Sequence, residues 1–259
     1  MIDVHCHLEQ KDYDKDRDQV IEKCKKELKA VITCAAHPKD FQLTLDLVKK
    51  NKNFIFCSMG LHPEYIKEFT EDDKDIFFNF VKENKGFISA VGEVGLDFNW
   101  VKEPEWQKKQ KEQFIEFINF SKEIKKPLVV HSRDAYEDVI KILEQEDAKK
   151  VHLHLFGANQ LVPRVIENKW FISIGPMILR SKKHFQIARD MPLDLLFLET
   201  DAPWNHPSVF LEGKKQRNDP TSIRVVAEEI AEIKKISFEE VWKKCAENAI
   251  NFFDLPISI

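Results

Sequence analysis

The chain has little of what marks several common classes of protein. Its 259 residues contain only 7 glycines and no Cys-x-x-Cys pair, and no apolar run approaches the roughly 18–20 residues that span a bilayer. The five cysteines are odd in number, and three of them lie in apolar, strand-like runs, which predicts buried, reduced thiols in a cytoplasmic protein. The first apolar run begins at Ile2, so we expect no targeting peptide and no membrane partner.

An excess of positive charge is also missing. The formal net charge is −4, from 40 basic and 44 acidic residues, which argues against a protein that holds long nucleic acid on a basic face. The balance does not exclude an enzyme that acts on a phosphodiester, because bound divalent cations reverse the local sign of charge. With 43% hydrophobic and 32% charged residues, the composition is that of a soluble globular protein.

The chain alternates short apolar runs with helical patterns. We expect strands in eight segments: 2–8, 30–35, 54–59, 88–92, 127–131, 151–155, 170–174 and 195–200. We expect helices at 14–28, 38–50, 71–83, 105–124, 135–145, 160–168, 182–189, 220–233 and 238–253. This pattern predicts an α/β protein, a (β/α)8 TIM barrel in which residues 1–259 form one domain. An open doubly wound sheet is the alternative, but no glycine-rich phosphate loop follows the first strand.

In a barrel of this type, chemistry is located at the carboxyl ends of the strands. Most of the predicted strands do end in or near histidine or acidic residues: the motifs are HCHL, GLHP, GEVGLDF, HSRDA, HLHLF and LETDAPW. Within the first motif, His5 and His7 share one face of a strand, so they are either two metal ligands or two polar residues on a solvated face. Such a concentration of histidine and carboxylate at strand ends favours a metal centre.

Together with RNDP at 217–220, these motifs resemble the TatD-type deoxyribonuclease family, within the wider amidohydrolase group of metal-dependent barrels. The motifs follow the family order from Ile2 to about Phe253. The resemblance implies ligands for two divalent cations at His5, His7, Glu93, His131, His154 and Asp201. It also implies that Glu93 bridges the cations, and that His62 and Arg133 lie close enough to meet a substrate phosphate.

The chemistry of these residue types agrees with that implication. Imidazole and carboxylate ligands suit Zn²⁺, Mn²⁺ or Mg²⁺, and the mixed set does not select one of them. Asp201 would complete one metal site and accept a proton from the attacking water, and Arg133 could pair with a phosphate oxygen. We therefore assign Asp201 and Glu93 as catalytic residues.

Several neighbouring residues have less defined expectations. We place His152 and Glu199 beside the ligands and His184 on a helix surface. Asp97 is expected to hold the loop after the fourth strand, outside the site. Trp204 either stacks on a base or packs beneath its loop.

These observations predict a metal-dependent deoxyribonuclease that hydrolyses single-stranded DNA or strand ends and needs no obligate protein partner. In a second hypothesis the protein uses the same metals to hydrolyse a different bond, in an aminoacyl-tRNA ester or another small ester, amide or phosphoester. A third is a non-catalytic, metal-stabilised binding barrel, which the complete ligand set disfavours.

Overall fold

Eight parallel strands form a closed barrel in sequence order. The computed structural model describes all 259 residues. Its strands are β1 (Ile2–Cys6), β2 (Ala30–Ala35), β3 (Ile55–Met59), β4 (Ile88–Asp97), β5 (Leu128–Arg133), β6 (Val151–Leu153), β7 (Phe171–Ile174) and β8 (Leu196–Leu198). The segment after β8 closes the ring, because the Asp201 N–H donates to the His5 carbonyl at 3.0 Å and the His7 N–H donates to the Ala202 carbonyl at 2.7 Å. The predicted (β/α)8 barrel is therefore confirmed.

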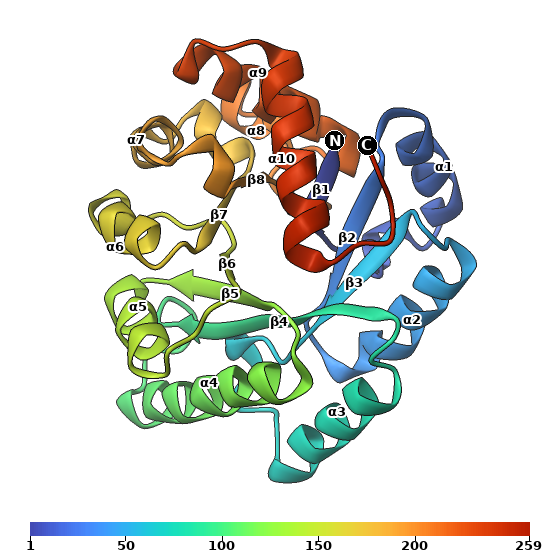
Figure 1. Cartoon of the computed structure of the whole chain (residues 1–259). Helices are drawn as coiled ribbons and strands as arrows, with labels where there is room; N and C mark the ends of the chain where they lie inside the picture. Colours follow the sequence, from blue (N-terminus) through green and yellow to red (C-terminus); the bar gives the residue numbers. More distant parts are fainter.

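Helices surround this barrel (Figure 1). They are α1 (Arg17–Glu27), α2 (Phe41–Lys50), α3 (Glu71–Glu83), α4 (Pro104–Ile124), α5 (Tyr136–Gln145), α6 (Val162–Glu167), α7 (Lys182–Asp190), α8 (Pro207–Leu211), α9 (Ile223–Lys234) and α10 (Phe238–Phe253). None of them combines the length and the apolar composition that crossing a bilayer requires. All five cysteines are buried and free, as predicted.

The bounds of the predicted elements hold best where a cap marks the helix end. Residues 71–83 and 238–253 form helices as predicted, and the side chains of Thr70 and Ser237 accept N–H groups at their amino ends. Other bounds move. The first turns predicted at 38, 160 and 220 are short 3₁₀ helices that lead into α2, α6 and α9, and α8 was not predicted.

The interior of the barrel changes from apolar to polar along its axis. Near the amino ends of the strands, Ile32, Phe56, Val129 and Phe197 belong to one buried cluster that includes Phe252 and neighbouring residues at the end of α10. Helix α10 lies across this end of the barrel in Figure 1. Side chains two residues apart share a strand face, so the next interior positions on these four strands are polar or sulfur-containing: Cys34, Ser58, His131 and Glu199.

Strand β4 continues past its predicted end at Gly92 and carries Glu93 inside the strand. Glycine permits this extension because Gly92 has φ +145° and a Cβ there would lie 2.4 Å from the Val129 carbonyl oxygen. Gly95 is similar, with φ +139°, and a Cβ there would lie 2.1 Å from the His131 carbonyl oxygen. The two glycines therefore let β4 lie directly against β5 on both sides of Glu93.

Candidate metal centre

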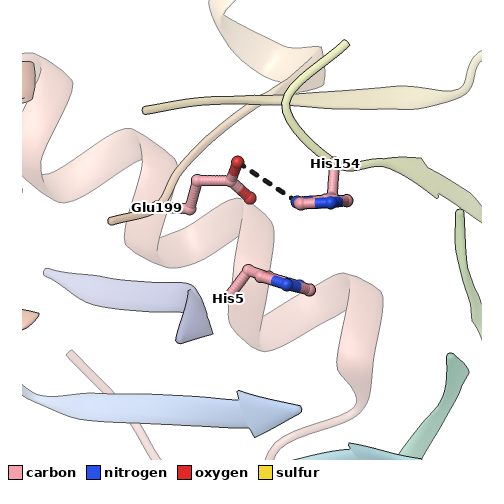
Figure 2. Close-up of side chains that lie close together, drawn as sticks. All are labelled: His5, His154 and Glu199. Atoms are coloured by element: carbon pink, nitrogen blue, oxygen red, sulfur yellow. Dashed lines mark ion pairs between the residues drawn. The ribbon is translucent and has the colours of Figure 1, made fainter. Parts of the chain in front are cut away.

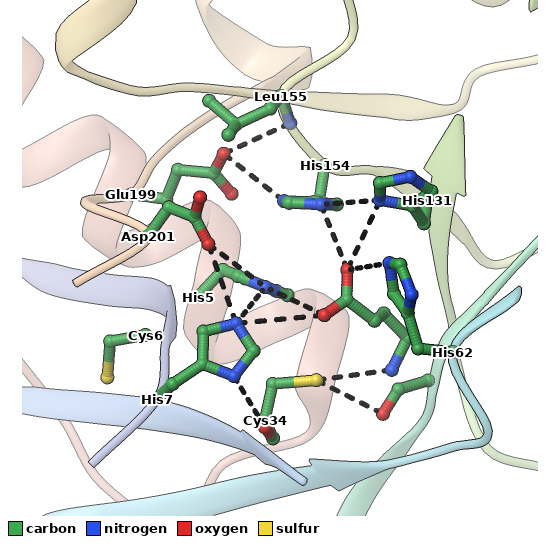
Figure 3. Close-up of polar contacts among 12 residues, drawn as sticks. His5, Cys6, His7, Cys34, His62, His131, His154, Leu155, Glu199 and Asp201 are labelled. Carbon is green, nitrogen blue, oxygen red and sulfur yellow. Dashed lines mark hydrogen bonds and ion pairs between the residues drawn. The ribbon is translucent and has the colours of Figure 1, made fainter. Parts of the chain in front are cut away.

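The structure brings all six predicted ligands together at the carboxyl end of the barrel. Figure 3 labels five of them, namely His5, His7, His131, His154 and Asp201. Their side chains come from five strands or the segments that directly follow them: His5 and His7 from β1, Glu93 from β4, His131 from β5, His154 from β6 and Asp201 from β8. Four of the six are buried, and His131 and Asp201 are half-buried. The barrel thus concentrates ligands from the two ends of the chain in one place.

One half of the centre contains the ligands from β1 and β8. The Nε2 atoms of His5 and His7 lie 3.2 Å apart. The Oδ1 atom of Asp201 lies 3.8 Å from the first and 3.5 Å from the second of these nitrogens. Three donor atoms therefore face one small volume.

The other half contains the ligands from β5 and β6. The Nδ1 atom of His131 lies 3.4 Å from the Nε2 atom of His154. The imidazole of His154 also stacks on that of His5, with ring centroids 4.0 Å apart. The two halves are therefore in direct contact.

Glu93 lies between the halves and directs one oxygen to each. Its Oε1 is 3.7 Å from His5 Nε2 and 3.6 Å from His7 Nε2. Its Oε2 is 3.0 Å from His154 Nε2 and 3.5 Å from His131 Nδ1. Burial raises the pKa of Glu93, but the surrounding imidazoles outweigh burial and hold that pKa well below its usual value. The carboxylate is therefore ionised and presents a separate oxygen to each half.

The far nitrogens of His131 and His7 face carboxylates. His131 Nε2 lies 2.9 Å from Asp97 Oδ2, and His7 Nδ1 lies 3.2 Å from Glu9 Oε1 and 2.8 Å from the Cys34 carbonyl oxygen. With a cation bound and the rings neutral, these acceptors would hold the proton on the far nitrogen and leave the nitrogen that faces Glu93 free to ligate. The expectation that Asp97 lies outside the site was wrong, because the extension of β4 carries it to the back of His131.

Glu199 stands in the same relation to His154 (Figure 2). Its Oε1 lies 3.5 Å from His154 Nδ1 and accepts the Leu155 N–H at 3.0 Å. Its Oε2 accepts the Ser173 hydroxyl, which in turn contacts His152 Nε2, each at 2.6 Å. His152 thus lies behind the ligands, where the sequence placed it.

His62 lies beside the ligand set but has a different protonation pattern. Its Nδ1 accepts the backbone N–H of Glu64 at 3.1 Å, so the proton of the neutral ring is on Nε2. That Nε2 lies 3.8 Å from Glu93 Oε2. Burial and the neighbouring His131 lower the pKa of His62 to about 3, which keeps the ring neutral. Its Nε2–H is therefore a hydrogen-bond donor toward the site, whereas a metal ligand would need a free lone pair there.

The centre opens into a cavity of about 640 Å³. Glu93, His62, Arg133 and Asp201 all contribute to its lining. The Asp201 side chain is held by an Asn205 amide, which donates to Oδ2 at 2.8 Å. The cavity has the size of a small-molecule or nucleotide site.

Two further side chains were misjudged or missed from the sequence. His184 is buried, with Nδ1 2.8 Å from the Ser181 hydroxyl that caps α7, and is not on a helix surface as expected. Glu9 was not singled out, although it is buried and accepts the Thr33 hydroxyl at 2.7 Å as well as facing His7. Its position two residues after His7 was an available signal, since an acidic side chain beside a ligand is a common way to orient it.

The donor set fits divalent cations. Two pairs of imidazole nitrogens lie 3.2 and 3.4 Å apart, close enough for the two nitrogens of each pair to ligate one cation. Histidine and carboxylate triplets within 4.8 Å of one another include His5, His7 and Glu93 in the first half and His5, His154 and Glu199 across the stacked rings. A third triplet includes His62, whose tautomer makes it a donor rather than a ligand.

Comparisons with known proteins agree with this geometry. The family model described as "TatD related DNase" matches residues 2–254. The chain is 34% identical to human "Deoxyribonuclease TATDN3" over 98% of this chain and 94% of that protein. It is 33% identical to "Uncharacterized metal-dependent hydrolase YabD" of Bacillus subtilis, over 98% of both.

A crystal structure of YJJV, a TatD homologue from Escherichia coli, superposes with a TM-score of 0.90 at 22% identity and covers 99% of this chain and 98% of that one. This likeness supports the fold, and the sequence matches support the family. The chain therefore belongs to the TatD-related DNase family of metal-dependent hydrolases.

Proposed function

We propose that this protein is a two-metal deoxyribonuclease that hydrolyses phosphodiester bonds in single-stranded DNA or at strand ends. The observation that carries the proposal is the position of Glu93, with one carboxylate oxygen within 3.7 Å of His5 and His7 and the other within 3.5 Å of His131 and His154. The printed names of relatives, deoxyribonuclease and metal-dependent hydrolase, support the same reaction class.

Two cations are expected in this arrangement. His5, His7, Glu93 and Asp201 would hold one, and Glu93, His131 and His154 would hold the other. A pair of divalent cations supplies a lowered pKa for bound water and neutralises charge on the attacking and leaving oxygens. The histidine-rich set suits Zn²⁺ or Mn²⁺ at least as well as Mg²⁺.

The protein's own side chains perform the remaining steps. Asp201 accepts the proton of the attacking water through Oδ1, which faces the centre, while its Oδ2 is occupied by Asn205. Burial raises the pKa of Asp201, but the close contact with His7 and the nearby imidazoles outweigh burial and lower the pKa overall, so the group is ionised and can act as a base. The His62 Nε2–H would donate to a phosphate oxygen, and the exposed Arg133 guanidinium at the cavity wall would pair with another.

The cleft favours a flexible strand over an intact duplex. The ligands lie at the bottom of a cavity within the barrel mouth, and a scissile phosphate must approach them closely. A single strand or a frayed end can enter such a cavity, whereas a duplex presents its phosphates on the outside of a wide rod.

The test is a substrate panel with the metal-stripped protein and each divalent cation restored in turn. We expect metal-dependent cleavage of end-labelled single-stranded DNA, slower cleavage of duplex DNA, and none by a matched Asp201→Asn preparation. Faster turnover of an aminoacyl ester than of any oligonucleotide would reject the nuclease assignment in favour of an esterase with the same metals.

A further inference from the structure

Two tryptophan side chains stand exposed at the mouth of the cavity. Trp100 is 59% exposed and Trp204 is 46% exposed, and both line the cavity that holds the metal centre. Of the other three tryptophans, Trp170 is buried and Trp106 and Trp242 are partly buried, and none lines the cavity. Single exposed apolar side chains are common, so exposure alone does not identify these two as binding residues.

They lie on opposite sides of the barrel mouth. Trp100 follows β4 and Trp204 follows β8, and in a closed ring of eight strands in sequence order these strands are diametrically opposed. The metal centre occupies the space between them. A ligand whose middle lies on the centre therefore extends toward one tryptophan on each side.

Each tryptophan is anchored to one half of the centre. The Trp204 ring lies 4.8 Å from the His7 ring, and its backbone N–H donates to the Asp201 carbonyl at 3.0 Å. The Trp100 backbone N–H donates at 2.8 Å to Asp97, the residue behind His131. Both indoles therefore have a backbone fixed relative to the ligands, which limits the freedom lost when something stacks on them.

A cation accompanies the Trp100 face. The Arg133 guanidinium lies over one face of the Trp100 ring, 5.7 Å from the ring centroid. An aromatic plane beside a guanidinium is the combination with which proteins bind unpaired nucleotides, one group for the base and the other for a phosphate. The acidic Asp40 and Glu64 line other parts of the cavity wall and would repel phosphates there.

We propose that Trp100 and Trp204 are stacking platforms for the two bases that flank the scissile phosphate of a single-stranded nucleic acid. The inference rests on the proposed function and adds a specificity element to the same site. A phosphodiester over the metal centre joins two nucleosides, and the structure offers one exposed indole for each. Stacking requires unpaired bases, so the two platforms select single strands or frayed ends over paired DNA.

The test compares Trp100→Ala and Trp204→Ala with Phe87→Ala. Phe87 is 40% exposed in the α3–β4 connection at the opposite end of the barrel, so it matches the loss of an exposed ring without touching the cavity. With metal-loaded enzyme and a single-stranded oligonucleotide, we expect each Trp→Ala change to raise KM by about 5- to 150-fold, the equivalent of one lost base stack. We expect kcat to stay within about threefold, and Trp→Phe variants to retain most of the affinity.

A second measurement links each ring to a base. Oligonucleotides carry a tetrahydrofuran spacer in place of the base on one side or the other of the cleaved bond. If a tryptophan stacks on that base, the Trp→Ala change should raise KM little further for a substrate that already lacks the base.

The outcomes separate the inference from the function on which it rests. The stacking role would be rejected if both variants cleave oligonucleotides with unchanged KM. It would also be rejected if the KM increase is the same on spacer-containing substrates. In either case the nuclease assignment would still hold. If no oligonucleotide is cleaved or bound by the metal-loaded protein, the proposed function fails and the inference fails with it.

Discussion

At the amino end of the barrel, strands β5 and β8 contribute Val129 and Phe197 to a closed apolar cluster with the end of α10. Two residues further along the same strand face, the same strands or the residues directly after them contribute His131 and Glu199 to the candidate metal centre. On each strand, two residues separate an apolar side chain whose burial stabilises the fold from a polar side chain whose burial costs free energy. Residues that stabilise the fold and residues that carry the proposed chemistry thus lie at opposite ends of one barrel interior, as in other barrels of this type.

Removal of metal should have the largest effect on activity, which depends on the polar end of the barrel, while leaving the fold at the apolar end intact. We expect chelation to reduce phosphodiester hydrolysis to background, because the histidine and carboxylate ligands alone cannot activate a water. The far-ultraviolet circular dichroism should remain that of the folded barrel, since the apolar cluster at the other end needs no cation. Restoring a divalent cation should restore activity; full activity in metal-free protein would contradict the mechanism.

The change Asp201→Asn should damage the polar end alone. It keeps an oxygen donor and nearly the same volume but removes the negative charge and the proton affinity of the base. We expect kcat to fall by about 10²- to 10⁴-fold, with the free energy of unfolding unchanged or slightly higher. Asp147→Asn, which changes an exposed acid in the turn after α5, is the matched control. A rate within a few-fold of wild type would show that Asp201 is not the base.

The change Phe197→Ala should damage mainly the apolar end. Phe197 is fully buried and packs against Phe171, Phe252 and Phe253, with ring centroids 4.5–5.7 Å apart. We expect denaturant titration to show a loss of about 3–5 kcal/mol in the free energy of unfolding. The activity of each folded molecule should change little. Phe185→Ala, at a ring that is 43% exposed, should cost well under about 1 kcal/mol. A Phe197 variant that is stable but inactive would break the division between the two ends.

The change Asp97→Asn should have a smaller effect, on metal affinity, and tests whether Asp97 belongs to the metal centre. Asp97 faces only the far nitrogen of His131 and the loop N–H groups of Asn99 and Trp100. Loss of its charge should lower the affinity for the cation at His131 by about 10- to 100-fold. Isothermal titration with metal measures this directly. Asp138→Asn, which removes a surface carboxylate paired with Lys111, should leave the affinity unchanged; an equal loss there would indicate a general charge effect.

The sequence predicted the barrel and the convergence of the ligands because both depend on local periodicity. An apolar run ending in histidine or carboxylate identifies a strand and its functional end together, and parallel strands bring those ends to one edge. The helices at 71–83 and 238–253 were predicted to the residue because a side-chain cap and an apolar stripe coincide there. These signals lie within a few residues of the feature they predict.

The missed features depend on contacts between distant segments. From the sequence, the glycine at 92 is typical of a strand end. In the structure β5 approaches so closely that only glycine fits there, and β4 therefore continues to Asp97. The pairing of Asp97 with His131 follows from that extension and spans 34 positions. The burial of His184 depends on how α7 packs on the barrel rather than on its polar sequence. The sequence pattern of a single helix or strand does not predict contacts between segments that are distant in the chain.

If Glu93 joins two metal sites, the number of cations bound per chain should fall when its carboxylate is removed. In Glu93→Gln one carboxylate oxygen becomes an amide nitrogen, which cannot ligate a cation while protonated. One cation keeps His5, His7 and Asp201, while the other keeps only His131 and His154.

The measurement is metal content by mass spectrometry after loading and gel filtration, for wild type and Glu93→Gln. We predict about two cations per wild-type chain without added bicarbonate, because no lysine lies within two positions of Glu93 or His131 to form a carbamate bridge. We predict about one per Glu93→Gln chain, with the fold intact and most activity lost. Two cations held as tightly in the variant as in wild type, or a bicarbonate requirement for loading, would contradict the account.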